Sequence, residues 1–204
     1  MIVIIDYSLG NTGSILNMLK RVGAEAVISS DPEVISRADK LVLPGVGAFD
    51  QGMAHLSDLG FISVLNEKVI NLRTPVLGIC LGMQLMTRNS EEGLSPGLGW
   101  INGRTVRFRH ELNTSFKVPH MGWNKVVPQK ESALLNGLGD DPRFYFVHSY
   151  HVFCEEQVDI LAVTSYGYEF VSAFRHGNVF GVQFHPEKSH KYGMKLLENF
   201  VEYS

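Results

Sequence analysis

The sequence is poor in cysteine, and it lacks both a basic run and a long apolar run. Two cysteines among 204 residues, Cys80 and Cys154, are too few for a disulfide scaffold and suit a reducing compartment. Lys and Arg are scattered along a chain of net charge -3, so nucleic acid is not an expected partner. The longest apolar stretches, such as residues 1–5, have the length of a strand and cannot span a membrane.

A secretion signal is also missing, because no charged segment precedes an apolar core and a cleavage site. We therefore expect a cytoplasmic protein. Hydrophobic residues make up 45% of the chain and charged residues 19%, which is typical of a folded enzyme rather than a disordered chain. No repeat, low-complexity tract or linker divides the sequence, and its length suits one domain over residues 1–204.

Strand and helix patterns alternate in the first half of the chain. Three apolar runs are typical of strands covered on both faces, at residues 2–5, 40–43 and 75–79. Helical spacing of apolar residues follows these runs, at 15–22, 51–72 and 81–88. Strands separated by helices in this way indicate a parallel sheet.

The second half of the chain is dominated by strand patterns. They lie at residues 105–108, 143–147, 160–164, 170–174 and 179–184. A helical stripe at 192–201 closes the chain. The two halves together predict an α/β fold, a flavodoxin-like three-layer domain whose central, mostly parallel sheet carries an antiparallel extension.

The segment Gly78-Ile79-Cys80-Leu81-Gly82 joins a predicted strand to a predicted helix. Glycines two positions before and after a nucleophile are the pattern of a nucleophile elbow, a turn so tight that its neighbours must be small. At the first turn of a helix, unpaired N–H groups stabilise a thiolate, and the amide of Leu81 could hold an oxyanion. The alternative is an inert buried cysteine, which is common for this residue type.

The segment His185-Pro186-Glu187 follows the last predicted strand. A thiol nucleophile needs a base, and the base needs a group that fixes its tautomer. Residues two apart at the end of a strand project to the same side, so His185 and Glu187 can meet, while Pro186 makes the corner rigid. One alternative is a solvent-facing turn. A metal site that includes His190 matches no established spacing, so we expect no metal.

The segment Pro44-Gly45-Val46-Gly47 follows the strand predicted at 40–43. Ligands of open α/β sheets bind at this end of the strands, and glycines let backbone N–H groups face a substrate. A phosphate cradle or an ordinary turn is the alternative. The loop at 10–13 has neither the dinucleotide-binding spacing nor the Walker lysine, so we predict no nucleotide cofactor.

Together these three segments resemble the class I glutamine amidotransferases, whose hallmarks are a G-x-C-x-G elbow, an upstream oxyanion loop and a late H-P-E. Four segments narrow the resemblance to the glutaminase subunits of imidazole glycerol phosphate synthases. They are residues 44–47, 80–85, 119–124 and 183–189, which read PGVG, CLGMQL, PHMGWN and QFHPEKS. The similarity extends from the first predicted strand to the last helix, and it implies the class I amidotransferase fold.

The resemblance implies that L-glutamine is hydrolysed to glutamate and ammonia by a triad of Cys80, His185 and Glu187. Cys80 would attack the side-chain amide, His185 would transfer the proton, and Glu187 would orient the imidazole. A glutamyl thioester would form and water would resolve it. Neither a metal nor an organic cofactor is implied for this step.

Further roles follow from the same resemblance. Gly47 and Leu81 would donate backbone amides to the oxyanion, and Val46 would lie in a flipping peptide beside them. Gln84 would contact the substrate, and His148-Ser149-Tyr150 would hold glutamine largely through its backbone. The alternatives are a polar helix residue at Gln84 and an ordinary strand end at 148–150.

The resemblance also implies a heterodimer with a (β/α)8-barrel cyclase, which uses the ammonia in histidine biosynthesis. Met121-Gly122-Trp123-Asn124 would face that partner or gate the passage to it, with a buried core Trp123 as the alternative. Cys154, His151, His176 and His190 are interpreted as structural or surface residues.

Other functions stay open on the sequence alone. Paralogous subunits supply ammonia to synthases that aminate or amidinate sugars for cell-surface polysaccharides, and the glutaminase motifs do not exclude that use. A hydrolase of γ-glutamyl peptides would work without a partner. A non-catalytic binding subunit is less consistent with a chain that keeps all three triad residues.

Overall fold

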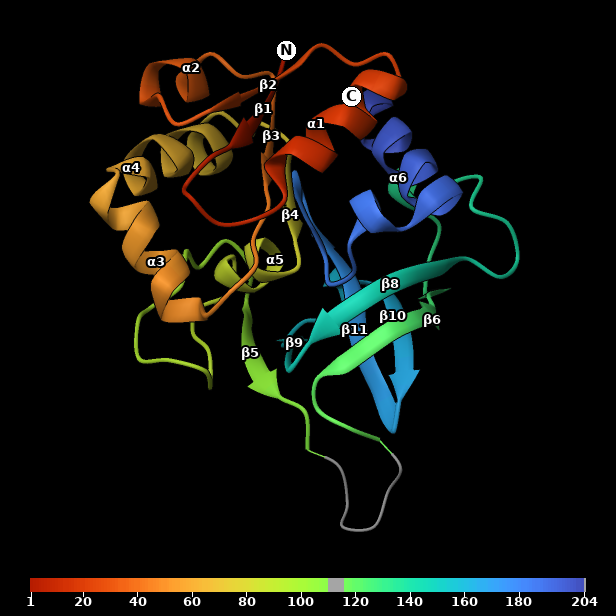
Figure 1. Ribbon diagram of the computed structural model, residues 1–204. Helices are drawn as coiled ribbons and strands as arrows, with labels where there is room; N and C mark the ends of the chain where they lie inside the picture. The colour runs from red at the N-terminus through yellow and green to blue at the C-terminus, as the bar shows by residue number, and fades with distance from the viewer. Residues whose placement is uncertain (110–115, 204) are drawn as a thin grey trace.

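A computed structural model describes residues 1–109 and 116–203 of the chain. Its centre is a large sheet with the strand order β2-β1-β3-β4-β12-β11-β10-β7 (Figure 1). The first five of these strands run parallel to one another: β2 (Ala26–Ser29), β1 (Ile2–Ile5), β3 (Lys40–Leu43), β4 (Val76–Ile79) and β12 (Val179–Val182). The predicted parallel sheet is thus confirmed.

Antiparallel strands extend this sheet beyond β12. They are β11 (Tyr168–His176), β10 (Ile160–Tyr166), β7 (Val127–Pro128), and the pair β9 (Tyr150–Cys154) and β5 (Gly103–Arg107), which joins through β11. A separate antiparallel pair consists of β6 (His120–Lys125) and β8 (Arg143–His148). The predicted antiparallel extension is therefore also confirmed.

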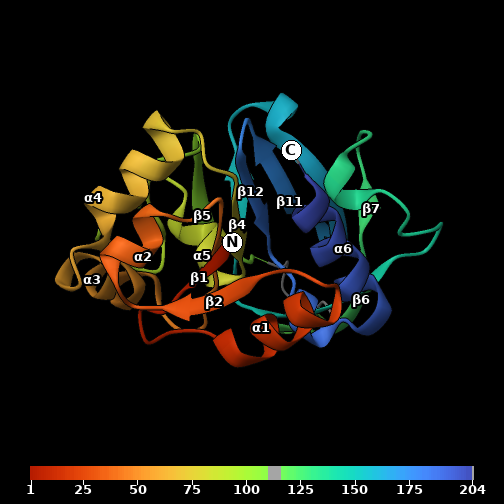
Figure 2. The same ribbon diagram turned by 90° about the horizontal axis from the view of Figure 1, so that it is seen from above.

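Helices cover both faces of the parallel strands (Figure 2). One face carries α1 (Thr12–Arg21) and α6 (His190–Glu202). The other carries α2 (Pro32–Ser36), α3 (Phe49–Asp58), α4 (Phe61–Asn66), a π-helical turn (Glu67–Asn71) and α5 (Leu81–Leu85). None of the helices within residues 1–109 and 116–203 has the length and apolar run that crossing a membrane requires.

Strand β1 explains why the first apolar run of the sequence is continuous. Ile2 and Ile4 pack in the core on the side of α1 and α6, whereas Val3 and Ile5 pack in the core on the side of α3 and α4. Because successive side chains of a strand point to opposite faces, a strand between two helical layers needs apolar residues at every position. This alternation produces the predicted three-layer domain.

Two predicted helices differ from the observed ones. The helix expected at 51–72 is interrupted at Gly60, whose φ of 68° ends α3 and starts α4. The helix expected at 81–88 ends at Leu85, because the chain turns back and residues 98–100 donate backbone hydrogen bonds to the carbonyls of residues 85–87. This return places the loop at 90–99 beside the elbow.

Adjacent parallel strands bring the three predicted motifs together. Strands β3, β4 and β12 are neighbours in the sheet, and their carboxyl ends lead into Pro44, Cys80 and Gln183 respectively. Ligands of open α/β sheets bind at this edge. The fold thus positions a candidate site at the carboxyl ends of three central strands.

Candidate active site

Cys80 occupies the turn between β4 and α5 in a backbone conformation that is rare for a residue with a side chain. Its φ is 53° and its ψ is -108°. The turn needs the flanking glycines, because a Cβ at Gly82 would lie 1.8 Å from the carbonyl oxygen of Leu43, and one at Gly78 would lie 2.7 Å from the methyl carbon of Met86. The predicted elbow geometry is present, with the side chain held above the strand end.

His185 and Glu187 are paired and almost fully buried. Nδ1 of His185 lies 2.8 Å from Oε1 of Glu187, and each side chain is 2% exposed. The two meet through a 3₁₀ turn (Pro186–Lys188), because strand β12 ends at Val182 rather than at the predicted Phe184. The expected pair is therefore formed by a turn and not by strand alternation.

The environment of His185 favours its protonated form. Burial lowers the pKa of this imidazole, but the Cys80 thiol and the Glu187 carboxylate together raise it to about 10. Nδ1 faces the carboxylate, so Nε2 is the nitrogen left for the thiol, and Nε2 is buried without a hydrogen-bond partner in the described part of the chain. This arrangement suits a thiolate–imidazolium pair.

A pocket of about 330 Å³ opens beside Cys80. The predicted oxyanion and substrate residues line it: Val46, Gly47, Leu81, Gln84, His148, Ser149 and Tyr150. Three lining residues were not expected from the sequence: Glu92, Pro119 and Val147. A larger hollow of about 950 Å³, lined by residues 128–133, 135–140 and Arg175, contains no predicted site residue.

The glycine loop after β3 lies against the elbow. The amide of Leu81 donates to the carbonyl of Gly45 at 3.3 Å, and the Tyr7 hydroxyl donates to the carbonyl of Pro44 at 2.5 Å. Gly47 has a φ of 121°, a conformation that favours glycine. The predicted oxyanion donor at Leu81 is thus engaged by the loop, so it can meet a substrate only when the Gly45 carbonyl moves away.

Gln84 and Gln183 connect the pocket to the nucleophile. The side-chain nitrogen of Gln84 donates to the Tyr150 carbonyl at 3.0 Å and to Oε1 of Gln183 at 3.1 Å. The nitrogen of Gln183 in turn lies 3.7 Å from Sγ of Cys80. The orientation of both amides is fixed, because a carbonyl can only accept, and Oε1 of Gln84 remains for a ligand.

Glu92 is the acidic side chain of the pocket that sequence reasoning missed. Its Oε2 accepts from the Phe49 amide at 2.9 Å, and the Asp50 carboxylate accepts the amides of Leu94 and Ser95. Burial raises the pKa of Glu92, and nearby Asp50 raises it further, while the Phe49 amide opposes both. Only the irregular loop at 90–99 positions this residue, and no motif signals it.

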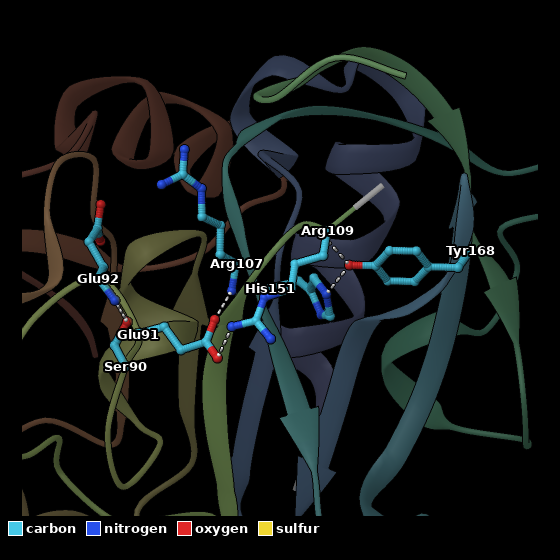
Figure 3. A network of polar contacts seen from close by, with 7 residues as sticks. All are labelled: Ser90, Glu91, Glu92, Arg107, Arg109, His151 and Tyr168. Carbon is cyan, nitrogen blue, oxygen red and sulfur yellow. Dashed lines mark hydrogen bonds and ion pairs between the residues drawn. The ribbon is translucent and has the colours of Figure 1, made fainter. Parts of the chain in front are cut away.

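Figure 3 shows how the neighbours of Glu92 hold this loop. The Glu92 amide donates to Oγ of Ser90, while Glu91 accepts from the Arg107 amide at 2.9 Å and from the Arg109 guanidinium at 2.8 Å. Glu91 therefore fastens the loop to strand β5, and Glu92 is left pointing towards α3.

The segment predicted to face a partner forms strand β6. Met121 is 61% exposed and Trp123 is 46% exposed, so the alternative of a buried core tryptophan is wrong. The Trp123 ring stacks on His190 with a centroid distance of 5.5 Å. Gly122 has a φ of 125°, and Asn124 turns inward to donate to the Ser165 carbonyl at 2.9 Å.

Cys154, His151 and His176 lie outside the lining of this pocket. Burial raises the pKa of the Cys154 thiol to about 12, which makes this sulfur unreactive. His151 hydrogen bonds to the Tyr168 hydroxyl at 3.0 Å (Figure 3), and His176 pairs with Asp159. These contacts are structural, as the sequence interpretation expected.

Comparison with known proteins identifies the family to which the chain belongs. The family model of the class-I glutamine amidotransferases matches residues 3–203. The imidazole glycerol phosphate synthase subunit HisH 2 of Methanococcus maripaludis is 56% identical, and its namesake in Pseudomonas aeruginosa is 55% identical, each over 99% of both chains. The HisH subunit of Sulfurimonas denitrificans is 48% identical over 100% of this chain and 98% of its own.

Solved structures agree on the fold. PurLQS from Thermotoga maritima superposes with a TM-score of 0.73 at 17% identity, covering 99% of this chain and 97% of the other. The glutaminase domain of Trypanosoma brucei CTPS, with bound acivicin, gives 0.63 at 15% identity over 100% and 94%. With a family model that spans nearly every residue, the chain belongs to the class-I glutamine amidotransferases.

Proposed function

We propose that this chain is the glutaminase subunit of an imidazole glycerol phosphate synthase and acts in histidine biosynthesis. Relatives that bear this subunit name are 42–56% identical over at least 98% of the chain. The observation that carries the chemistry is the buried His185–Glu187 pair beside the strained Cys80. Two free cysteines suit a reducing compartment, and we assign the chain to the cytoplasm.

In the proposed reaction, the Cys80 thiolate forms a bond with the side-chain amide carbon of L-glutamine. His185 donates its proton to the leaving nitrogen, and ammonia departs as the tetrahedral intermediate collapses to a thioester. His185 then takes a proton from water, which attacks the thioester and releases glutamate and the thiolate. Glu187 keeps the imidazole in the tautomer and orientation that both transfers need.

The oxyanion of the tetrahedral intermediate would be held by the amides of Gly47 and Leu81. The Leu81–Gly45 hydrogen bond of 3.3 Å must open for this, and the peptide at Val46 must turn its N–H inward. A donor that is blocked at rest limits hydrolysis to the moments when the loop is rearranged. Partner docking would supply that rearrangement.

The pocket suits the amino-acid end of glutamine. Glu92 is positioned to accept the α-ammonium group, and Oε1 of Gln84 offers a further acceptor. The backbone of His148, Ser149 and Tyr150 lines the other side, where its amides would receive the α-carboxylate. This assignment places the side-chain amide of the substrate towards Cys80.

We further propose a heterodimer in which a (β/α)8-barrel cyclase covers strand β6. Met121 and Trp123 expose apolar surface on this strand, and Met121 pairs with Val147, which lines the pocket. A partner on this strand would therefore lie beside the place where ammonia is released. Gly122 and Asn124 complete the proposed interface.

A second candidate is a glutaminase that supplies ammonia for the amination or amidination of a sugar. The relatives at 56% and 55% identity both carry the numeral 2 in their names, whereas the relatives at 48% and 47% carry none. A numeral separates copies within one organism, and a second copy can serve a different synthase. The glutaminase chemistry is the same in both candidates.

The decisive experiment combines the purified chain with the cyclase of the same organism. We expect glutamine-dependent formation of imidazole glycerol phosphate, and Cys80→Ser should lower it at least about 1000-fold because the nucleophile is lost. Ammonia-dependent synthesis by the same complex should stay within about twofold, because the partner performs that step.

The other outcomes identify the alternatives. Loss of both activities in Cys80→Ser would mean that Cys80 is structural. A wild-type chain that is idle with the cyclase but active with a sugar-modifying synthase would establish the second candidate. Rapid hydrolysis by the isolated chain would indicate a hydrolase without a partner, and inactivity with every synthase would indicate a binding subunit.

A further inference from the structure

A continuous series of polar groups links strand β6 to the glutamine pocket. The Asn124 side-chain nitrogen lies 3.3 Å from Nε2 of His120, and Nδ1 of His120 lies 3.1 Å from Nε2 of His148. Nδ1 of His148 then lies 2.7 Å from the carbonyl oxygen of Tyr150. His120 is 2% exposed and His148 is 6% exposed, so the two imidazoles are shielded from water.

Donors and acceptors along this series permit one consistent pattern of protons. The Tyr150 carbonyl can only accept, so Nδ1 of His148 carries the hydrogen and Nε2 of His148 is an acceptor. His120 must then donate from Nδ1, and its Nε2 accepts from the Asn124 amide. Burial lowers the pKa of His148 well below its usual value, and the neighbouring histidines lower it further, which keeps this imidazole neutral.

The Tyr150 carbonyl is the junction between this series and the nucleophile. It accepts from His148 on one side and from the Gln84 side chain, at 3.0 Å, on the other. Gln84 continues to Gln183, and Gln183 to Sγ of Cys80. A shift of His148 would therefore move the same carbonyl that fixes the Gln84 amide in the pocket.

Packing alone does not require an imidazole at position 120. The ring stacks on Phe146 at 4.8 Å and on Tyr166 at 4.0 Å, an environment that a phenyl ring would fill as well. A buried polar ring costs free energy unless its hydrogen bonds are made, so its benefit must come from the bonds themselves. Those bonds fix the position of His148.

We propose that His120 is a positioning residue for glutamine binding, which acts through His148 to hold the Tyr150 carbonyl and the Gln84 amide in place. This inference rests on the proposed glutaminase function. His120 does not touch the substrate pocket, whereas His148 and Tyr150 line it. The expected effect of altering His120 is therefore on the KM for glutamine more than on kcat.

Two substitutions of His120 by an amide side chain distinguish a positioning role from a need for its volume alone. Asparagine places its amide nitrogen near the position of a histidine Nδ1, whereas glutamine reaches only the position of Nε2. We expect His120→Asn to keep the KM for glutamine within about threefold, because it can still donate to His148. His120→Gln and His120→Phe should raise KM about tenfold, the fold-change expected for one buried hydrogen bond.

The measurement is steady-state glutamine hydrolysis by the complex with the cyclase, with the thermal unfolding midpoint of every variant recorded. His151→Phe is the matched control, because His151 is also buried in the same aromatic cluster but bonds to Tyr168, outside the series (Figure 3). Its KM should equal that of the wild type. If His120→Phe fails to fold, the comparison of His120→Asn with His120→Gln decides.

Two results would overturn the inference. Equal KM values for wild type and His120→Gln would show that the contact with His148 does not position the pocket. KM values that rise equally in all three variants, in step with the loss of thermal stability, would assign His120 a merely structural role. A wild-type complex that hydrolyses no glutamine would instead refute the proposed function, and the inference with it.

Discussion

Cys80 holds a conformation that costs about 1–3 kcal/mol for a residue with a Cβ. Its φ of 53° is maintained by the surrounding structure, since its amide donates to the Val182 carbonyl at 2.8 Å and the next amide donates to Gly45. Strain of this kind persists only where neighbouring bonds over-determine it. This conformation holds Cys80 at the end of β4, where its sulfur is among the groups that raise the pKa of His185.

Glu187→Gln should lower the pKa of His185 from about 10, because the neutral amide no longer stabilises the imidazolium. The decrease should be about 1–3 units, the usual effect of one close carboxylate. The raised pKa of this imidazole favours the folded state fully below the unfolded value of about 6.5, and that contribution is lost as the pH rises towards 10. The stability of Glu187→Gln should therefore decrease less than that of the wild type between about pH 6.5 and pH 10.

Nuclear magnetic resonance of the ¹⁵N-labelled imidazole of His185 would measure its pKa directly in the wild type and in Glu187→Gln. An unchanged pKa would mean that the thiol alone sets it. Glutamine hydrolysis should also fall, but by less than in Cys80→Ser, because orientation of the base is only part of the triad's effect. Equal losses would assign Glu187 a larger role than orientation.

At the scale of elements, the elbow requires α5 to cross the end of β3 at very short range. Gly82→Ala should destabilise the fold by about 2–3 kcal/mol or more, because the new Cβ would lie 1.8 Å from the rigid backbone oxygen of Leu43. Gly13→Ala in α1 is the matched control, since nothing lies within 4 Å of its added Cβ. The control should gain up to about 1 kcal/mol. Urea unfolding of both variants would measure the difference, and equal stabilities would contradict the crowded geometry.

The elements that the sequence predicts are those with strong periodicity or a short motif. Strands β1, β3 and β4 are apolar at nearly every position because helices cover both faces, so their ends could be placed closely. Strands β6 and β9 escaped prediction, because their polar residues and the glycine at 122 give no alternation. Helix α5 is shorter than expected because the backbone amides of residues 98–100 donate hydrogen bonds to the carbonyls of residues 85–87.

The same contrast holds for the candidate site. The triad could be predicted from the sequence, and so could the pocket residues that belong to a motif. Each of them lies next to the end of a strand, and its motif indicates the chemistry. Glu92 comes from an irregular loop. Its position depends on its own contact with Phe49, 43 residues away in the chain, and on the contact of Ser95 in the same loop with Asp50, 45 residues away. The contacts of Gln183 and His120 likewise depend on packing between elements, which no local pattern encodes.

At the scale of the whole molecule, the site lies where the parallel and antiparallel parts of the sheet meet. Strand β12 pairs parallel with β4 and antiparallel with β11, and the β6–β8 pair lies beside this junction (Figure 1). The nucleophile comes from the parallel part, and one wall of the pocket comes from β8. A partner bound to β6 would therefore contact the wall and leave the helical layers free.

Trp123→Ala tests this arrangement, because Trp123 is 46% exposed and contributes little to the core. We expect the Kd of the complex with the cyclase to rise about 30-fold, since a buried aromatic at an interface centre contributes about 2 kcal/mol. The unfolding midpoint of the isolated chain should stay within about 2 °C. Isothermal titration calorimetry would measure the affinity.

Val158→Ala is the control for loss of exposed apolar surface, because Val158 is 73% exposed on a 3₁₀ turn (Gln157–Asp159) outside β6. Its Kd should match the wild type. A Kd unchanged by Trp123→Ala would move the docking surface away from β6. A Kd weakened equally by both variants would mean that association depends on general surface hydrophobicity, because a specific interface distinguishes a central aromatic from a distant valine.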